Sequence, residues 1–264
     1  VTIKNTIGGE GTFNFTTTST VEPGTTILDN SNVGPFSIKS DDTDIFSSTQ
    51  NPNTQTVLAA PGFPSHVTLT ETIPNEGWKF DGVVCVSTGG KGSTATYSGS
   101  TANITFQDED SVTCTYTNIK LPKLTLVKNL TKDNGGTAVA TDWTLSADGP
   151  TDISGVTGNT AVTNALVDPG TYDLSESGPD GYSASDYSCV VNGGNPVVGN
   201  SIDLVAGDEA VCTITNNDNA PSLTLVKEVT NNNGGNAIAS AWTLTATGPT
   251  GFSGPTGSTG STGD

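Results

Sequence analysis

The stretch Leu124-Thr-Leu-Val-Lys128 opens a unit that the chain repeats, and Cys212-Thr-Ile-Thr-Asn216 closes it. Between them lies Tyr172-Asp-Leu-Ser-Glu176. Apolar and polar side chains alternate in all three stretches, which is the period of a half-buried strand. Residues 124–217 form the clearest copy of the unit, and variants of it precede and follow.

Spacings around the cysteines align the preceding copy with this one. Trp78 lies seven residues before Cys85, as Tyr182 does before Cys189, and Asn118 and Asn216 each follow a cysteine by four residues. Matched spacings of this kind indicate a repeated fold. We therefore predict a first unit (1–119), a linker (120–123), a second unit (124–217), a linker (218–222) and a partial third unit (223–264).

Composition favours an all-β protein. The chain of 264 residues holds 32 Gly and 14 Pro but no Met, and it is rich in Thr, Ser and Asn. Short strands joined by many turns have this profile, whereas helices do not. We expect tandem Ig-like β-sandwiches of about seven strands each.

Charge limits the choice of partners. The formal net charge is −18, and every basic residue is lysine. Nucleic-acid binding relies on a basic surface and mainly on arginine, so we exclude it. No apolar stretch approaches the ~20 residues that a membrane-spanning helix needs. The one His, and the lack of C-x-x-C spacing, argue against a zinc site.

The four cysteines fall as one pair in each complete unit, at equivalent positions. We predict the disulfides Cys85–Cys114 and Cys189–Cys212, which would place the protein in an oxidising, extracellular compartment.

Strand alternation also places polar residues on apolar faces. Lys128 shares a face with two leucines, Glu176 with Tyr172 and Leu174, and Asn216 with Cys212 and Ile214. The sequence puts Glu71 and Asn118 in the same positions of the first unit. Lys4 differs, because Val1 and Ile3 share the other face, so we expect Lys4 to point away from the core unless a bulge shifts the register.

Burial gives this set of residues a possible chemistry. It drives a lysine toward the neutral amine and a glutamate toward the protonated acid. A neutral amine can attack a carboxamide while the acid donates a proton, which would give an intramolecular Lys–Asn isopeptide bond and release ammonia. The alternative is an edge lysine paired with a glutamate, and an asparagine that caps a turn.

Three stretches carry a resemblance to a known family: 124–128, Tyr172 to Glu176 with Gly181-Tyr182, and Thr215-Asn216. They are similar to the prealbumin-like, CnaB/SpaA-type repeat domains of bacterial surface proteins and pilins. The resemblance implies a Lys128–Asn216 bond assisted by Glu176. In the first unit the corresponding set is Lys4, Asn118 and Glu71, with the lysine register as a departure from the family pattern.

Two regions leave questions open. The third unit repeats the opening strand and Trp242-Thr-Leu244, but it has no glutamate strand and no cysteine pair, so we expect it to be a fragment or to be completed by another chain. The acidic runs 41–44 and 108–110 allow Ca²⁺ binding, although solvated acidic loops explain them as well. We predict no other cofactor.

These patterns favour an extracellular structural protein that forms a stalk, a surface-adhesin shaft or a pilus-like filament, and not an enzyme. Its expected partners are copies of itself or further repeats, with a host or surface ligand as an addition. The alternative function is a carbohydrate- or protein-binding adhesion module, for which the long polar insert from Val21 to Gln55 is the candidate region.

Overall fold

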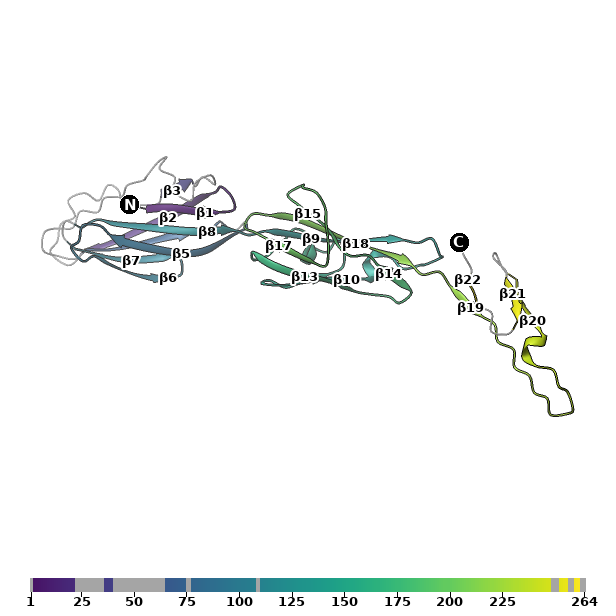
Figure 1. Ribbon diagram of the computed structural model, residues 1–264. Helices are drawn as coiled ribbons and strands as arrows, with labels where there is room; N and C mark the ends of the chain where they lie inside the picture. Colours follow the sequence, from purple (N-terminus) through teal and green to yellow (C-terminus); the bar gives the residue numbers. More distant parts are fainter. Residues whose placement is uncertain are drawn as a thin grey trace.

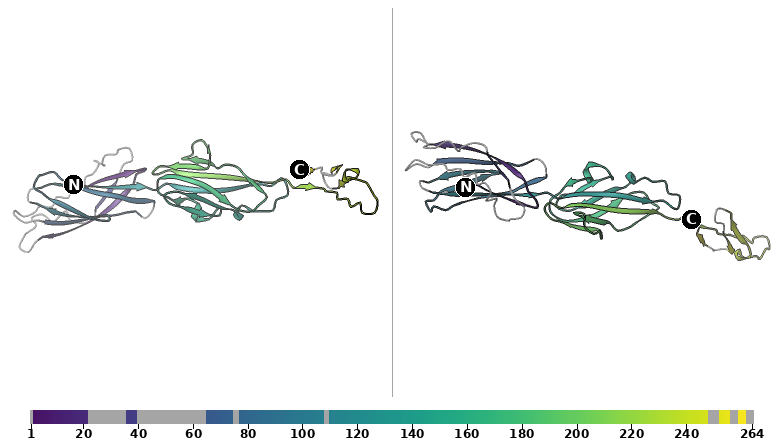
Figure 2. Two further views of the ribbon diagram at one scale, coloured as in Figure 1. Left: turned by 60° about the horizontal axis from the view of Figure 1, so that its bottom comes forward. Right: turned by 90° about the horizontal axis from the view of Figure 1, so that it is seen from above.

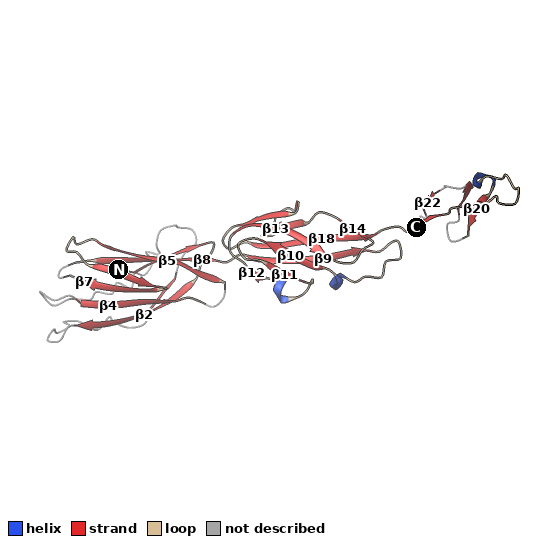
Figure 3. Cartoon of the chain, turned by 90° about the horizontal axis from the view of Figure 1, so that it is seen from below, coloured by secondary structure: helices blue, strands red, loops and turns tan. Residues whose placement is uncertain are grey.

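The computed structural model describes residues 2–21, 36–39, 65–74, 77–107, 110–247, 252–255 and 259–261. Two β-sandwiches follow one another end to end, and a smaller group of strands comes after them (Figures 1 and 2). Nearly all regular structure in the described residues is strand, with three short 3₁₀ turns (Figure 3). The prediction of an all-β chain of tandem sandwiches is confirmed.

The first unit packs a three-stranded sheet, ordered β1-β8-β5, against a five-stranded sheet, ordered β3-β2-β4-β7-β6. β1 and β8 are parallel, and the other neighbouring pairs are antiparallel. The strands are β1 (Thr2–Ile7), β2 (Thr12–Val21), β3 (Phe36–Lys39), β4 (Ser65–Thr72), β5 (Trp78–Ser87), β6 (Thr94–Ser98), β7 (Thr101–Phe106) and β8 (Val112–Lys120).

The second unit repeats this plan with a sheet ordered β12-β9-β18-β15-β16, which β14 joins at β18, and a facing sheet ordered β11-β10-β13-β17. Here β9 and β18 are the parallel pair. The elements are β9 (Lys123–Thr131), η1 (Ala140–Asp142), β10 (Thr144–Asp148), β11 (Ile153–Gly155), η2 (Thr160–Val162), β12 (Ala165–Leu166), β13 (Gly170–Ser177), β14 (Tyr182–Ala184), β15 (Ser188–Val191), β16 (Val197–Val198), β17 (Ser201–Leu204) and β18 (Glu209–Asp218).

The described part of the third unit contains two separate strand pairs, β19 with β22 and β20 with β21. Its elements are β19 (Ser222–Thr224), η3 (Ala239–Ala241), β20 (Thr243–Ala246), β21 (Phe252–Pro255) and β22 (Thr259–Ser261). Trp242 remains 38% exposed, whereas its counterpart Trp143 is 2% exposed.

Each complete unit has its own core between its two sheets, because alternate side chains of every strand point inward. In the first unit Phe13 and Phe15 are fully buried, together with Tyr116 and Cys114. In the second, the core centres on leucines of β9 and β10 and on Tyr172.

An edge-to-face pair of aromatics closes the same end of each core. Phe13 meets Trp78 edge to face at 5.1 Å, and Trp143 meets Tyr182 in the same way at 5.0 Å. The residues predicted to correspond from their spacing to the cysteines thus occupy the same place in the fold.

Backbone hydrogen bonds connect the two complete units. Leu121 N donates to Gly77 O at 2.7 Å, and Gly207 N donates to Lys120 O at 2.8 Å. In the second unit, Lys123 N at the start of β9 donates to Asp208 O at 2.8 Å. Only Leu121 and Pro122 separate strands β8 and β9, so the connection is short and held on both sides.

Candidate functional site

A lysine, a glutamate and an asparagine meet in the core of the second unit. Lys128 lies on β9 and pairs in register with Ile214 of the parallel strand β18, so Asn216 stands two residues further on the same inward face. Glu176 comes from β13 in the facing sheet. The parallel pairing of the first and last strands of the unit therefore brings residues 88 positions apart into one cluster (216 − 128).

Glu176 bridges the other two side chains. Lys128 Nζ forms an ion pair with Glu176 Oε2, and Asn216 Nδ2 donates to Glu176 Oε1 at 2.7 Å. The ammonium also lies 4.7 Å from the centre of the Trp143 ring, where a cation–π contact is favourable. The side chain of Lys128 is wholly buried, and that of Glu176 is 12% exposed.

The first unit contains the same cluster. Lys4 Nζ lies 2.6 Å from Glu71 Oε1, and Asn118 Nδ2 donates to the same oxygen at 3.3 Å. Phe13 takes the place of the tryptophan, with its ring centre 4.1 Å from the ammonium. Both the lysine and the glutamate side chains are fully buried.

The expectation that Lys4 points away from the core was wrong. Lys4 is 1% exposed and Thr6 is also buried, whereas Ile7 on the opposite face is 48% exposed. Lys4 pairs with Tyr116 as Lys128 pairs with Ile214, with no bulge between β1 and β8. The aromatic ring of Phe13 gives the lysine an attractive inward neighbour, and this contact outweighs the apolar pattern of the first three residues.

Burial shifts the titration of these groups. Removal from water lowers the pKa of Lys4 to about 8, against the opposing pull of Glu71. It raises the pKa of Glu71, and it lowers the pKa of Lys128. Desolvation disfavours the charged form, so it moves Lys4 and Lys128 toward the neutral amine and Glu71 toward the protonated acid.

The asparagine side-chain oxygens of both clusters are buried acceptors. Among the described residues, neither Asn118 Oδ1 nor Asn216 Oδ1 has a hydrogen-bond partner, and the same holds for Glu71 Oε2. Buried polar atoms without partners cost free energy, so an unpaired acceptor deep in a core needs an explanation. A protonated carboxyl group would supply the missing donor once the carboxamide, whose Nδ2 faces the glutamate, turns over.

The third unit keeps the lysine and its aromatic neighbour. Lys227 Nζ lies 5.1 Å from the centre of the Trp242 ring. An aromatic residue therefore accompanies the lysine in all three copies, as Phe13, Trp143 and Trp242. The sequence analysis assigned these aromatics no role, and the presence of an aromatic at one place in every repeat was the available signal.

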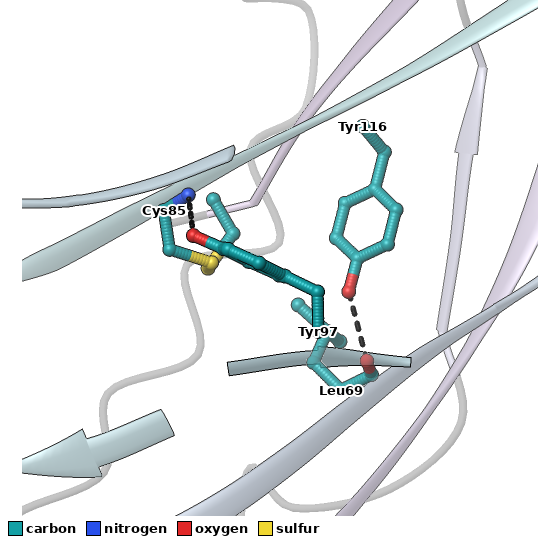
Figure 4. The surroundings of a disulfide bond; sticks show 5 residues. Leu69, Cys85, Tyr97 and Tyr116 are labelled. Carbon is teal, nitrogen blue, oxygen red and sulfur yellow. Dashed lines mark hydrogen bonds between the residues drawn. A yellow bond between two sulfur atoms is a disulfide. The ribbon is translucent and has the colours of Figure 1, made fainter. Parts of the chain in front are cut away.

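Both predicted disulfides are present in the structure. Cys85 faces Cys114 across β5 and β8, and Cys189 faces Cys212 across β15 and β18, so each bond joins neighbouring strands of one sheet. Figure 4 shows that the Tyr97 hydroxyl lies beside the first of these bonds, where it accepts from Cys85 N at 2.9 Å. In the second unit strand β16 pairs with β15, the strand that carries Cys189.

Other predicted regions contribute little that the structure describes. The acidic run 41–44 and nearly all of the insert 21–55 lie outside the described residues. Of the run 108–110 only Asp110 is described, and its carboxylate accepts from Ser87 Oγ and from the backbone of Ser93 and Ser111. Within the described ranges no group of three or more His, Cys, Asp or Glu residues could hold a metal ion. No helix there has the length and apolar character of a membrane span.

The fold and these clusters define a tandem β-sandwich protein with a Lys-Glu-Asn set in each complete core. Two SpaA-type family models, both described as a prealbumin-like fold domain, match the sequence, one over residues 1–120 and the other over 120–214 and 218–264. The chain therefore belongs to the family of prealbumin-like fold domains.

Two solved structures are similar at low sequence identity. The major pilin T-13 of Streptococcus pyogenes is 16% identical, with 83% of this chain and 96% of the pilin covered and a TM-score of 0.30. A C-terminal fragment of the pilus adhesin SpaC from Lactobacillus rhamnosus GG is 15% identical, with 85% and 98% covered and a TM-score of 0.28. A comparison with curated protein sequences found no match.

Proposed function

We propose that the chain is part of an extracellular structural shaft whose two complete units close Lys–Asn isopeptide bonds in their cores. The bonds are Lys128–Asn216, assisted by Glu176, and Lys4–Asn118, assisted by Glu71. The observation that carries this proposal is the repeated contact of one buried carboxyl group with both the amine and the carboxamide.

The reaction begins with a proton transfer inside the ion pair. When the ammonium of the lysine gives one proton to the carboxylate of the glutamate, two charges disappear, and desolvation favours that change. The neutral Nζ then attacks Cγ of the asparagine side chain. In both units the asparagine presents Nδ2 to the carboxyl group, so the carboxamide first turns about its Cβ–Cγ bond. The carboxyl group then donates to Oδ1, which has no other partner among the described residues.

Collapse of the tetrahedral intermediate breaks the bond between Cγ and Nδ2. The glutamate, now a carboxylate, takes one proton from Nζ and passes it to Nδ2, which departs as ammonia. It then takes the proton from Oδ1 as the carbonyl group re-forms. The amine and carboxamide become one secondary amide and one ammonia, and the acid is regenerated. Each unit reacts once, so the chain crosslinks itself and does not turn over an external substrate.

Two further features support a shaft. The complete units lie end to end with a short hydrogen-bonded connection (Figure 2). The two disulfides are typical of an oxidising compartment outside the cytosol. In such a shaft a bond between the first and last strands of each unit would carry tension past the strands between them.

Intact mass under denaturing and reducing conditions tests the crosslinks. The wild-type mass should fall short of the mass calculated from its composition by one ammonia per complete unit. Asn118→Ala and Asn216→Ala should each lack only one ammonia relative to their own composition. Lys123→Ala, at the first residue of β9, whose side chain is 44% exposed, serves as the control and should retain both losses. A full-composition mass for the wild type would rule the crosslinks out.

A further inference from the structure

The outer face of the five-stranded sheet in the first unit carries no charged side chain on strands β2, β4, β7 and β6. Outward side chains alternate at positions 14–18 of β2, 66–72 of β4, 101–105 of β7 and 94–98 of β6, and each is Thr, Ser, Asn or His. The chain as a whole holds 27 acidic residues. A neutral surface of this extent is therefore unusual for the molecule.

The second unit shows what the same face looks like with ordinary surface charge. Aligning Glu71 with Glu176 and Phe15 with Leu145 makes Asp148, Asp173 and Asp203 the counterparts of three threonines. The strand registers agree, because Thr18 pairs with Thr68 as Asp148 pairs with Asp173, and His66 pairs with Thr105 as Thr171 pairs with Asp203. Three aspartates of one unit are thus Thr18, Thr68 and Thr105 in the other.

Side chains on this face form hydrogen bonds with one another. Thr70 Oγ1 and Thr101 Oγ1 lie 2.9 Å apart, and Thr68 Oγ1 donates to Asn103 Oδ1 at 3.2 Å. His66 Nδ1 lies 3.1 Å from Thr105 Oγ1. Hydroxyl groups that bond to one another across strands need less water, so covering the face costs less than covering free polar groups.

We propose that this face is a contact surface for a second copy of the chain, which packs against it through the same face. Two copies with a net charge of −18 repel each other over most of their surface. The neutral face removes that repulsion locally, and the aspartates of the second unit would restore it. A contact between identical faces needs only one surface and closes on itself as a dimer.

The size of the face sets the strength of the contact. Four strands spaced ~4.8 Å apart and about 20 Å long give roughly 400 Å² per copy. Stable interfaces bury about 800 Å² per partner, so a single contact should be weak and reversible. In a shaft with many units, which is the part that rests on the proposed function, repeated contacts would align neighbouring shafts side by side.

Sedimentation equilibrium on the purified chain tests the proposal. The weight-average mass should rise from the monomer value of 26.7 kDa toward twice that value as concentration increases. The double variant Thr68→Asp/Thr105→Asp installs residues that the second unit carries at the same positions, and it should abolish the rise. The control Ser154→Asp/Ser201→Asp adds the same charge to exposed positions of the second unit and should leave association unchanged.

A second measurement locates the contact. Thr70→Cys, at the centre of the face, should form a disulfide between two copies under oxidising conditions, whereas Ser175→Cys at the equivalent position of the second unit should not. A wild type that stays monomeric at every concentration would overturn the proposal. So would an equal loss of association in both aspartate variants, which would indicate net charge alone. Intact mass of the same samples reads the crosslinks independently.

Discussion

The two complete units hold the same three residue types at the same registers, yet they exclude water to different degrees. Lys4 and Glu71 are both fully buried, whereas Glu176 is 12% exposed beside a fully buried Lys128. Strand pairing sets the positions of the three groups, and it is nearly identical in the two units. Access of water is set by the neighbouring side chains, and it differs. Register therefore fixes which groups meet, while the neighbouring side chains fix how completely each group is removed from water.

The largest expected effect comes from removing the acid. Glu71→Gln keeps the shape of the side chain but leaves Lys4 without a counter-charge, which should cost the first unit about 3–5 kcal/mol in free energy of unfolding and prevent its crosslink. Glu176→Gln should cost the second unit less, because solvent reaches that carboxylate. Urea unfolding followed by intact mass measures both effects.

Glu209→Gln is a matched control for these variants, since that carboxylate pairs with Lys123 at the surface. It should leave stability nearly unchanged, because an exposed ion pair contributes little, and leave both crosslinks in place. Retention of a crosslink in either Glu71→Gln or Glu176→Gln would show that the acid does not assist the reaction.

Removing each disulfide compares the stability contributed by equivalent bonds, one between β5 and β8 and the other between β15 and β18. The closed loops of 29 and 23 residues predict about 3.5 kcal/mol each, with only about 0.2 kcal/mol between them. However, β5 is an edge strand covered at Cys85 by Tyr97, whereas β15 lies between β18 and β16. The double variant Cys85→Ala/Cys114→Ala should therefore destabilise its unit more than Cys189→Ala/Cys212→Ala does.

Thermal unfolding of the two double variants checks this expectation, and Tyr97→Phe tests its cause. If the edge matters, Tyr97→Phe should add to the loss in the first unit by about 1 kcal/mol, the usual value of one hydrogen bond. Equal losses in both units would mean that loop closure alone explains the contribution of the disulfides.

The pH dependence of stability separates the crosslinked from the uncrosslinked state. In Asn118→Ala the amine of Lys4 stays free, with a pKa of about 8 in the folded chain against 10.5 for an ordinary lysine. Between these values the unfolded chain binds the extra proton, so stability should rise with pH across that window, by at most about 3 kcal/mol. Below the window both states are protonated, and the dependence disappears.

The crosslinked wild type should show no such rise, because an amide nitrogen does not titrate. Denaturant unfolding at several pH values between neutral and strongly alkaline measures the difference, and Asn118→Ala/Lys4→Met removes the group and gives the baseline. A rise of equal size in the wild type would show that Lys4 carries a free amine and that the first unit is not crosslinked.

Most of the fold follows from the sequence because strand alternation and the repeated spacing are local and redundant. Glu71, Glu176, Asn118 and Asn216 were placed inward by the apolar residues two positions away. Lys4 was misplaced for the same reason, since Val1 and Ile3 suggested the opposite face. Its aromatic neighbour Phe13 belongs to another strand, and such a contact between strands leaves no trace in a local pattern.

The sheet that a short strand joins could not be predicted from the sequence either. In the second unit β16 extends the sheet of β15, whereas in the first unit the segment after β5 forms β6 and pairs with β7 of the facing sheet. Nothing in the alternation of either segment decides between these sheets, because both residues of β16 are exposed and only Ala95 of β6 is partly buried. The hydroxyl of Tyr97 covers the edge that is left, and this contact became visible only in three dimensions.

The smallest expected effect lies where the two units meet. Lys79 of the first unit pairs with Asp168 of the second at 2.6 Å, with side chains 53% and 30% exposed. Exposed ion pairs contribute ~0.2–1 kcal/mol and weaken with salt. Lys79→Ala should therefore lower the unfolding free energy by less than about 1 kcal/mol at low salt and by nothing measurable at high salt. The backbone hydrogen bonds of Leu121, Lys123 and Gly207 would still hold the connection, because they do not depend on the ion pair. Thermal unfolding at both ionic strengths measures this, and a large loss that persists in salt would mean that the pair, and not the backbone, joins the units.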